Sequence, residues 1–203
     1  MRFLLTAFEP FDGSGLNSSL AGCELFVAQW GDLFDHRFAV LPVEYGADTE
    51  AVERAVAERP PDVVLHTGQS RPAEMILVER IAVNVRYAEV SAGTPPRERP
   101  QTLIDPQEPP ALFATLPVQE LADAIRAEGV PAAVSNHAGI YLCNHVLYRS
   151  LLRASRGGSR YRAGFLHAPR LPEQVAPGEP AMPAAQIARA IFASLRHVCA
   201  GRA

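Results

Sequence analysis

Residues 2–8, RFLLTAF, are an apolar run that ends at Pro10 and Gly13. A continuous apolar stretch of this length, closed by proline and glycine, is typical of a strand that is buried on both faces of a parallel sheet. The next segment, residues 17–30, has apolar side chains at helical intervals behind Asn17, a candidate N-cap. A strand is expected at 36–43, so the chain begins with a strand–helix–strand unit.

The same alternation continues to the end of the chain. We expect an extended segment at 74–85, a long irregular segment at 91–116, strands at 62–68, 131–139 and 161–168, and helices at 48–60, 117–129, 143–155 and 184–200, with Asp48 as a candidate cap of the second helix. Alternating strands and helices form a mostly parallel, twisted sheet with helices on both faces. The predicted fold class is α/β, a three-layer α/β/α sandwich, as one domain over residues 1–203.

Composition excludes several classes of protein. Hydrophobic residues make up 48% of the 203 residues, which is typical of a globular chain, and the net charge of −3 argues against nucleic acid as a partner. No apolar run approaches the ~20 residues needed to cross a bilayer, so no membrane partner is expected. Three cysteines without a framework spacing indicate reduced thiols and a cytoplasmic location.

Cys143 occupies an unusual place for an isolated cysteine. It follows a predicted strand and the loop at Gly139, and it directly precedes a helix. The N–H groups at a helix start carry partial positive charge, which favours a thiolate. The alternative is that Cys143 is a small packing residue, as we expect for Cys23 and Cys199 within their helices.

A nucleophilic cysteine needs a base and a group that orients the base. Among six histidines, His167 ends a strand before a proline-rich loop, where a parallel sheet places catalytic groups. His66 fits a core histidine, and the side chain of His145 diverges from Cys143 on the same helix. Glu79 lies in an apolar extended stretch, where a buried carboxylate needs a partner: either a salt bridge or the imidazole that it orients.

Two other uses of these residues are weaker. No histidine or cysteine spacing matches a zinc site, so no metal is expected. The G-x-G at Gly13 and Gly15 lacks the third glycine of a dinucleotide fingerprint, and the sequence implies no cofactor.

Four motifs in order resemble the pyroglutamyl peptidase I (pyrrolidone-carboxylate peptidase) family of cysteine peptidases. They are LLTAFEPFDG with LNSS, HTGQS followed by VERIAVNV, GIYLCNHVLY, and GFLHAP. The resemblance implies an α/β/α fold without a cofactor, often as a homotetramer. It also implies Cys143 as nucleophile, His167 as base and Glu79 as the orienting acid.

By the same resemblance, the expected substrates are peptides with an N-terminal pyroglutamyl residue. The neutral lactam ring calls for apolar walls and a few polar groups. Phe8 and Phe11 are candidate walls, with core packing as the alternative, and Asn17 and Gln69 are candidate polar contacts.

The sequence departs from the family pattern near the expected site. Ala7 stands where the family usually has glycine, and Glu89 stands where it usually has an arginine near the active site. A carboxylate there would repel a developing oxyanion, unless Arg86 substitutes for the missing arginine. Two alternatives therefore remain: a relative that binds pyroglutamyl ends without cleaving them, and a different cysteine amidase on the same scaffold.

Overall fold

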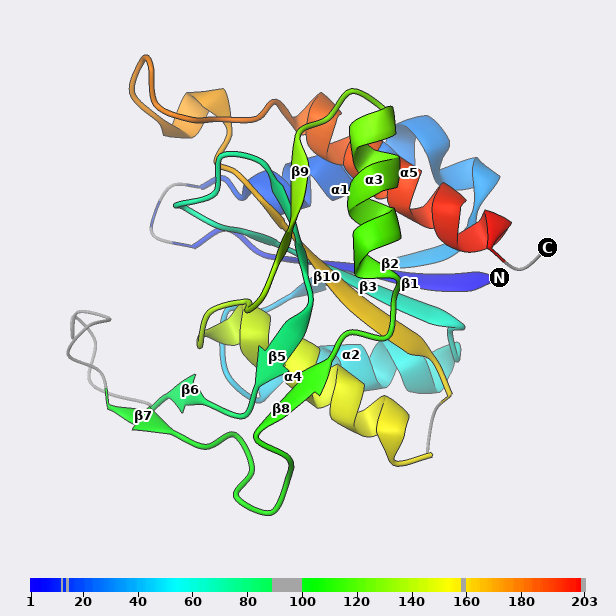
Figure 1. Ribbon diagram of the computed structural model, residues 1–203, viewed down its shortest axis with the longest axis vertical. Coiled ribbons are helices and arrows are strands. Elements are labelled where there is room, and N and C mark those ends of the chain that lie inside the picture. The colour runs from blue at the N-terminus through cyan, green and yellow to red at the C-terminus, as the bar shows by residue number, and fades with distance from the viewer. Residues whose placement is uncertain (12, 14, 89–99, 158–159, 202–203) are drawn as a thin grey trace.

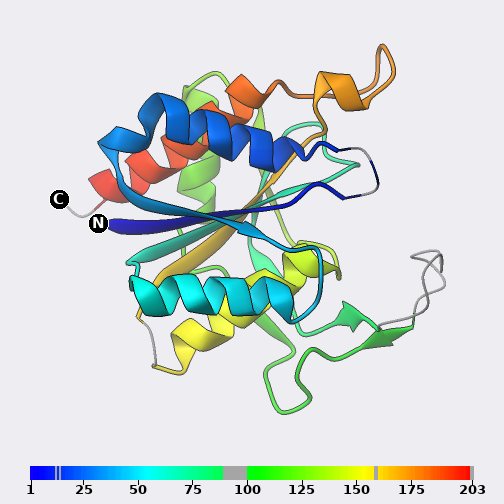
Figure 2. The ribbon, with the colours of Figure 1, turned by 180° about the vertical axis from the view of Figure 1, so that it is seen from behind.

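A computed structural model shows a central sheet between two helical layers (Figures 1 and 2). It describes residues 1–11, 13, 15–88, 100–157 and 160–201. The helices are α1 (Ser18–Trp30), α2 (Ala47–Glu58), α3 (Val118–Ala127), α4 (Leu142–Ser155) and α5 (Ala184–Ala200), with short 3₁₀ turns at Gly31–Leu33 and Pro172–Gln174. None of these described helices has the length and hydrophobicity that a membrane span requires.

The main sheet has the strand order β2-β1-β3-β10-β4-β9. These strands are β2 (Asp35–Leu41), β1 (Arg2–Phe8), β3 (Val63–Gln69), β10 (Arg162–Ala168), β4 (Ile76–Glu79) and β9 (Ala132–Ser135). Neighbours pair in parallel except β10 and β4, which are antiparallel. The predicted mostly parallel α/β fold is therefore confirmed.

Parts of the predicted extended and irregular segments form short strands outside the main sheet. β5 (Ile81–Val83) pairs with β8 (Ala111–Phe113), and β6 (Arg86–Tyr87) pairs with β7 (Gln101–Thr102). Residues 89–99, which include Glu89, lie outside the described residues.

Each face of the sheet has its own apolar core. One core packs α1, α3 and α5 on one face, and the other packs α2 and α4 on the opposite face (Figure 2). β1 and β3 contribute alternate residues to the two cores, because successive side chains of a strand point to opposite faces. This is why their sequences read as continuous apolar runs.

Two local predictions were wrong. The N-cap of α2 is Gly46, and Asp48 lies inside the helix, fully buried, where its Oδ2 atom contacts Nδ1 of His145 at 2.8 Å. Cys199 is exposed, whereas Cys23 is buried as expected.

Asn17 is confirmed as the N-cap of α1, with its Oδ1 atom accepting the Ser19 N–H at 3.0 Å.

Helices α1 and α5 approach closely at Gly22. A Cβ atom at this position would lie 2.3 Å from Cγ2 of Ile187, closer than atoms can pack. Alanine is the better helix former, by about 1 kcal/mol, but overpacking costs about 1–3 kcal/mol. We expect Gly22→Ala to lower the free energy of unfolding, measured by urea denaturation.

The matched control removes the obstructing side chain. The double variant Gly22→Ala/Ile187→Ala should lose less stability than the sum of the two single variants. Additive losses would show that the contact between the two helices does not limit the size of residue 22.

Candidate active site

Strand register explains how His167 and Glu79 meet. His167 pairs with Leu77 across the antiparallel β10–β4 ladder. Glu79 is two residues beyond Leu77, so it lies on the same face, diagonal to His167. The Nδ1 atom of His167 is 2.7 Å from Oε1 of Glu79, and the two residues are only 6% and 1% exposed. The second carboxylate oxygen of Glu79 is buried, with no hydrogen-bond partner among the described residues.

Cys143 is the second residue of α4, which lies on this same face of the sheet. The N-cap residue, Tyr141, makes no side-chain cap, so no capping side chain occupies the N–H groups of the first turn. These groups lie beside the thiol and carry the partial positive charge of the helix start.

The neighbour of Cys143 ties the helix start to the adjoining strand. The buried side chain of Asn144 accepts the Val83 N–H at 2.9 Å and donates to the Val83 and Val85 carbonyls at 2.8 and 3.0 Å. A side-chain amide that replaces strand pairing in this way fixes the position of the first turn of α4 over the sheet.

Gly68 gives the thiol its place on the sheet. It pairs with His167 in the β3–β10 ladder, and a Cβ atom there would lie 2.9 Å from Sγ of Cys143 and 2.8 Å from the ring of Phe165. The missing side chain therefore lets the thiol sit directly over β3, next to the imidazole.

The neighbouring side chains raise the pKa of His167. Burial disfavours its cationic form, but Cys143, which also hydrogen-bonds the imidazole, and Glu79 outweigh burial and raise the pKa of His167 from 6.5 to about 10. The structure thus favours the protonated imidazolium form of His167 beside Glu79 and Cys143.

A cavity of about 70 Å³ opens beside the thiol. It is lined by Cys143, by all four predicted substrate-binding residues, Phe8, Phe11, Asn17 and Gln69, and also by Val43, Tyr141 and Leu142. The last three were missed by sequence reasoning. For Tyr141 and Leu142 a signal existed, because they directly precede Cys143, whereas nothing local marks Val43.

The two polar residues of the cavity also hold its walls in place. Asn17 is 2% exposed, and beyond its capping bonds its Nδ2 atom donates to the Glu9 carbonyl at 3.2 Å. Oε1 of Gln69 accepts the Ser18 N–H at 2.8 Å. Within the described part of the chain nothing accepts a hydrogen bond from Nε2 of Gln69, which leaves this group available to a ligand.

The remaining titratable candidates have structural partners. His66 is fully buried between Thr6 and Ser150, and burial lowers its pKa to about 3, as for the core histidine predicted. Burial raises the pKa of Cys23 to about 12, so this thiol is inert. Among the described residues, no group of three potential ligands could hold a metal ion. The Arg86 guanidinium, one candidate to replace the family arginine, lies 4.7 Å from the centre of the Tyr45 ring.

Known proteins are similar to this chain in both sequence and fold. The sequence model of the pyroglutamyl peptidase family matches residues 1–200. The chain is 35% identical to pyrrolidone-carboxylate peptidase 1 of Caldanaerobacter subterraneus, over 97% of each chain, and 38% identical to pyrrolidone-carboxylate peptidase of Streptomyces coelicolor, over 96% of this chain and 90% of that one.

Among solved structures, pyroglutamyl peptidase I from Bacillus amyloliquefaciens superposes with a TM-score of 0.85 at 29% identity, covering 97% of this chain and 93% of that chain. A mutant pyrrolidone carboxyl peptidase from Pyrococcus furiosus superposes with a TM-score of 0.84 at 31% identity, covering 99% of both chains. The family model matches nearly the whole sequence, the motifs of the chain stand in the family's order, and the solved relatives share its fold. The chain therefore belongs to the pyroglutamyl peptidase family.

Proposed function

We propose that the protein removes the N-terminal pyroglutamyl residue from peptides by acyl transfer through Cys143, His167 and Glu79. The single observation that carries this proposal is the meeting of the three side chains beside a small cavity. The thiol lies close enough to His167 to raise its pKa, His167 contacts Glu79, and the thiol also lines the cavity, so a ligand in the cavity contacts the nucleophile directly.

In the proposed first step, the Cys143 thiolate attacks the pyroglutamyl carbonyl carbon. His167, protonated, donates its proton to the leaving amine as the peptide bond breaks, and an acyl-enzyme forms. His167 then takes a proton from water, which attacks the thioester and releases pyroglutamate. Glu79 holds the Nδ1–H of the imidazole throughout and stabilises its positive charge.

The start of α4 supplies the electrostatics for the developing oxyanion. N–H groups of its first turn lie at the thiol, where the negative charge forms on the attacked carbonyl oxygen. The bonds of Asn144 to β5 hold this turn in place before substrate arrives, so little reorganisation is needed during the reaction.

The cavity suits an uncharged N-terminal ring. Apolar walls come from Phe8 and Phe11, and none of the described lining residues is acidic, so none of them would pair with a free ammonium group. The Gln69 amide is the candidate for contact with the lactam, and Asn17 fixes the wall beside it. The homotetramer implied by the family resemblance and the cytoplasmic location inferred from the three cysteines stay predictions.

A turnover assay tests both the proposed activity and the proposed role of Cys143 as the nucleophile. Purified protein should release aminomethylcoumarin from its pyroglutamyl derivative and not from the prolyl or free glutamyl derivatives. Cys143→Ala should abolish release while the fold persists by circular dichroism, because alanine offers no nucleophile.

Cys23→Ala and Cys199→Ala are the matched controls and should keep activity. Binding without release would support the non-catalytic relative, and cleavage of a glutamyl or prolyl derivative would support a different amidase. Either result would overturn the proposed function.

Glu79→Gln tests the orienting role. The substitution keeps a hydrogen-bonding side chain but removes the charge that stabilises the imidazolium, so kcat should fall far more than KM rises. In triad enzymes such a loss can reach about 10⁴-fold. A folded variant with near-normal kcat in steady-state assays would remove Glu79 from the mechanism.

Cys143 helps to raise the pKa of His167, so the charge of the imidazole at a given pH depends on Cys143. In ¹⁵N NMR spectra of labelled imidazoles, His167 should stay protonated up to about pH 10 in the wild-type protein. Cys143→Ala removes the leading favourable partner, so the titration should move to lower pH. Cys199→Ala, as the control, should leave it unchanged.

The raised pKa of His167 also makes the free energy of unfolding depend on pH. Because the pKa of His167 is raised in the folded protein, its contribution to stability is fully present below about pH 6.5, the value in the unfolded chain, and is lost as pH rises through about 10.

In the NMR experiment, an unshifted His167 titration in Cys143→Ala would contradict the proposed thiolate–imidazolium pair.

A further inference from the structure

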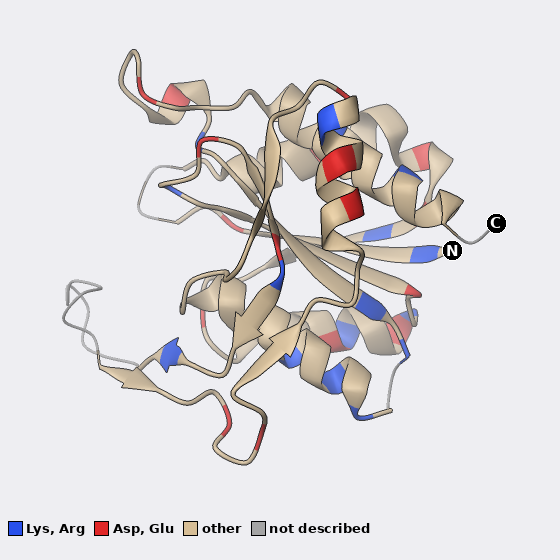
Figure 3. Ribbon diagram, viewed as in Figure 1, with Lys and Arg blue, Asp and Glu red and all other residues tan. Residues whose placement is uncertain are grey.

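A second cavity, of about 250 Å³, lies on the α2–α4 side of the molecule. Its lining includes Tyr45, Thr49, Arg86, His145 and Arg149. Two of these residues are arginines and one is a histidine, and none of the described residues that line the cavity is acidic. Figure 3 marks basic residues on both β6 and α4, the elements that carry Arg86 and Arg149. The cavity therefore matches an anion.

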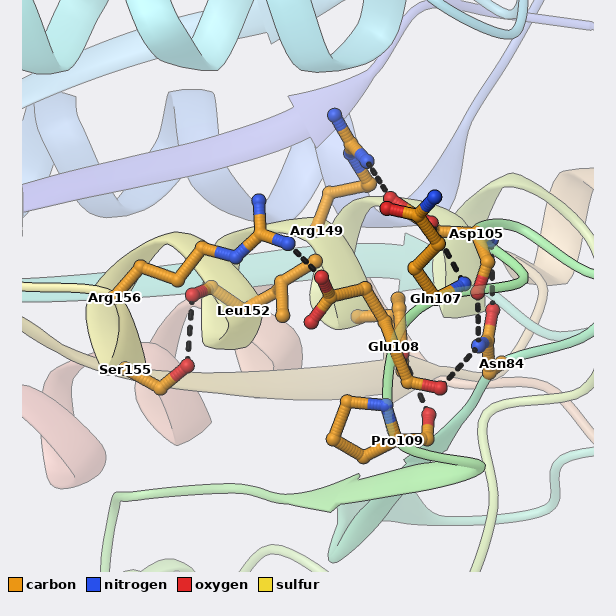
Figure 4. A network of polar contacts seen from close by, with 10 residues as sticks. Asn84, Asp105, Gln107, Glu108, Pro109, Arg149, Leu152, Ser155 and Arg156 are labelled. Carbon is orange, nitrogen blue, oxygen red and sulfur yellow. Dashed lines mark hydrogen bonds and ion pairs between the residues drawn. The ribbon is translucent and has the colours of Figure 1, made fainter.

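The Arg149 guanidinium is only weakly engaged by protein. Its Nη1 atom lies 3.8 Å from Oδ2 of Asp105, near the limit of an ion pair (Figure 4). The loop that carries Asp105 does not depend on this contact, because Nδ2 of Asn84 donates to the Asp105 carbonyl at 2.7 Å and Oδ1 of Asn84 accepts the Asp105 N–H at 2.9 Å. Most of the five N–H donors of the Arg149 guanidinium remain for a ligand.

His145 gives a second, independent indication of a ligand. The residue is only 7% exposed, and its Nδ1 atom lies 2.8 Å from Oδ2 of Asp48, which is fully buried. The ring lines the cavity, and its Nε2 atom bonds to no residue that the structure describes. In its cationic form the ring donates through both nitrogens, so Nε2 can donate to an anion while Nδ1 donates to the Asp48 carboxylate.

The second cavity adjoins the candidate active site through aromatic rings. Tyr141 lines the cavity beside Cys143, and its ring lies 5.7 Å from the ring of Tyr45 in an edge-on arrangement. Tyr45 in turn lines the second cavity, under the guanidinium of Arg86. A peptide whose first residue fills the small cavity can thus extend across Tyr141 toward the basic one.

We propose that the second cavity binds a carboxylate on the leaving side of the substrate, through Arg149, His145 and Arg86. This inference rests on the proposed peptidase function. It makes the protein selective among pyroglutamyl peptides: those that place a carboxylate in this cavity are cleaved with the higher kcat/KM.

The test compares matched substrates that differ only at the C-terminus. Pyroglutamyl-Ala, pyroglutamyl-Ala-Ala and pyroglutamyl-Ala-Ala-Ala are each prepared as the free acid and as the amide, and release of pyroglutamate is followed by chromatography. At the length that reaches the cavity, the free acid should have a kcat/KM about fivefold higher than its amide. Added salt should reduce this ratio, because it screens the charges.

Two variants and one control assign the preference to the cavity. Arg149→Gln removes a cation, and His145→Asn keeps a donor for Asp48 while removing the free ring nitrogen, so each should bring the acid-to-amide ratio close to 1. Arg153→Gln is the matched control. Arg153 lies one turn further along α4, pairs with Glu53 at 3.4 Å and does not line this cavity, so its removal should leave the ratio unchanged.

Equal cleavage of acids and amides at every length would overturn the inference and leave the proposed function standing. A preference that survives in either Arg149→Gln or His145→Asn, or one that Arg153→Gln also abolishes, would overturn it too. If the wild-type protein cleaves none of the six peptides, the proposed function fails, and the inference fails with it.

Discussion

The candidate site depends on how closely the start of α4 approaches the sheet. Gly68 presents no side chain, so the Cys143 thiol can sit on β3 beside His167. Asn144 then fastens the same helical turn to β5. A side chain at residue 68 would lift the thiol from the imidazole, and the trio would lose its geometry while the sheet itself remained. The hydrogen bond between His167 and Glu79 completes the arrangement from the other side.

Local signals in the sequence predict most of the main sheet and its covering helices. Apolar runs closed by proline or glycine correspond to β1 and β3, and the predicted cap at Asn17 opens α1. His167 was predicted from a strand end, Glu79 from its place in an apolar extended stretch and Cys143 from a helix start, and the resemblance to a family joined the three. Their roles stay predictions, but their proximity is a feature of the structure.

What the sequence could not provide depends on contacts between distant segments. Asp48 reads as a helix cap because acidic residues favour a helix start, yet it is buried against His145, 97 residues away. Cys199 lies in an amphipathic helix, and only the packing of α5 decides that it faces outward. No local pattern shows that β10 pairs with both β3 and β4, which is what brings Glu79 to His167.

The position of β10 in the sheet determines when the main sheet can be completed during synthesis of the chain. β10 is the last strand of the main sheet in the chain, yet it lies between β3 and β4. Until residue 168 has left the ribosome, both of those apolar strands have an unpaired edge, and such edges bind other strands. The nascent chain therefore holds its thiol without its imidazole. The two edges stay open to other strands until β10 pairs with both of them.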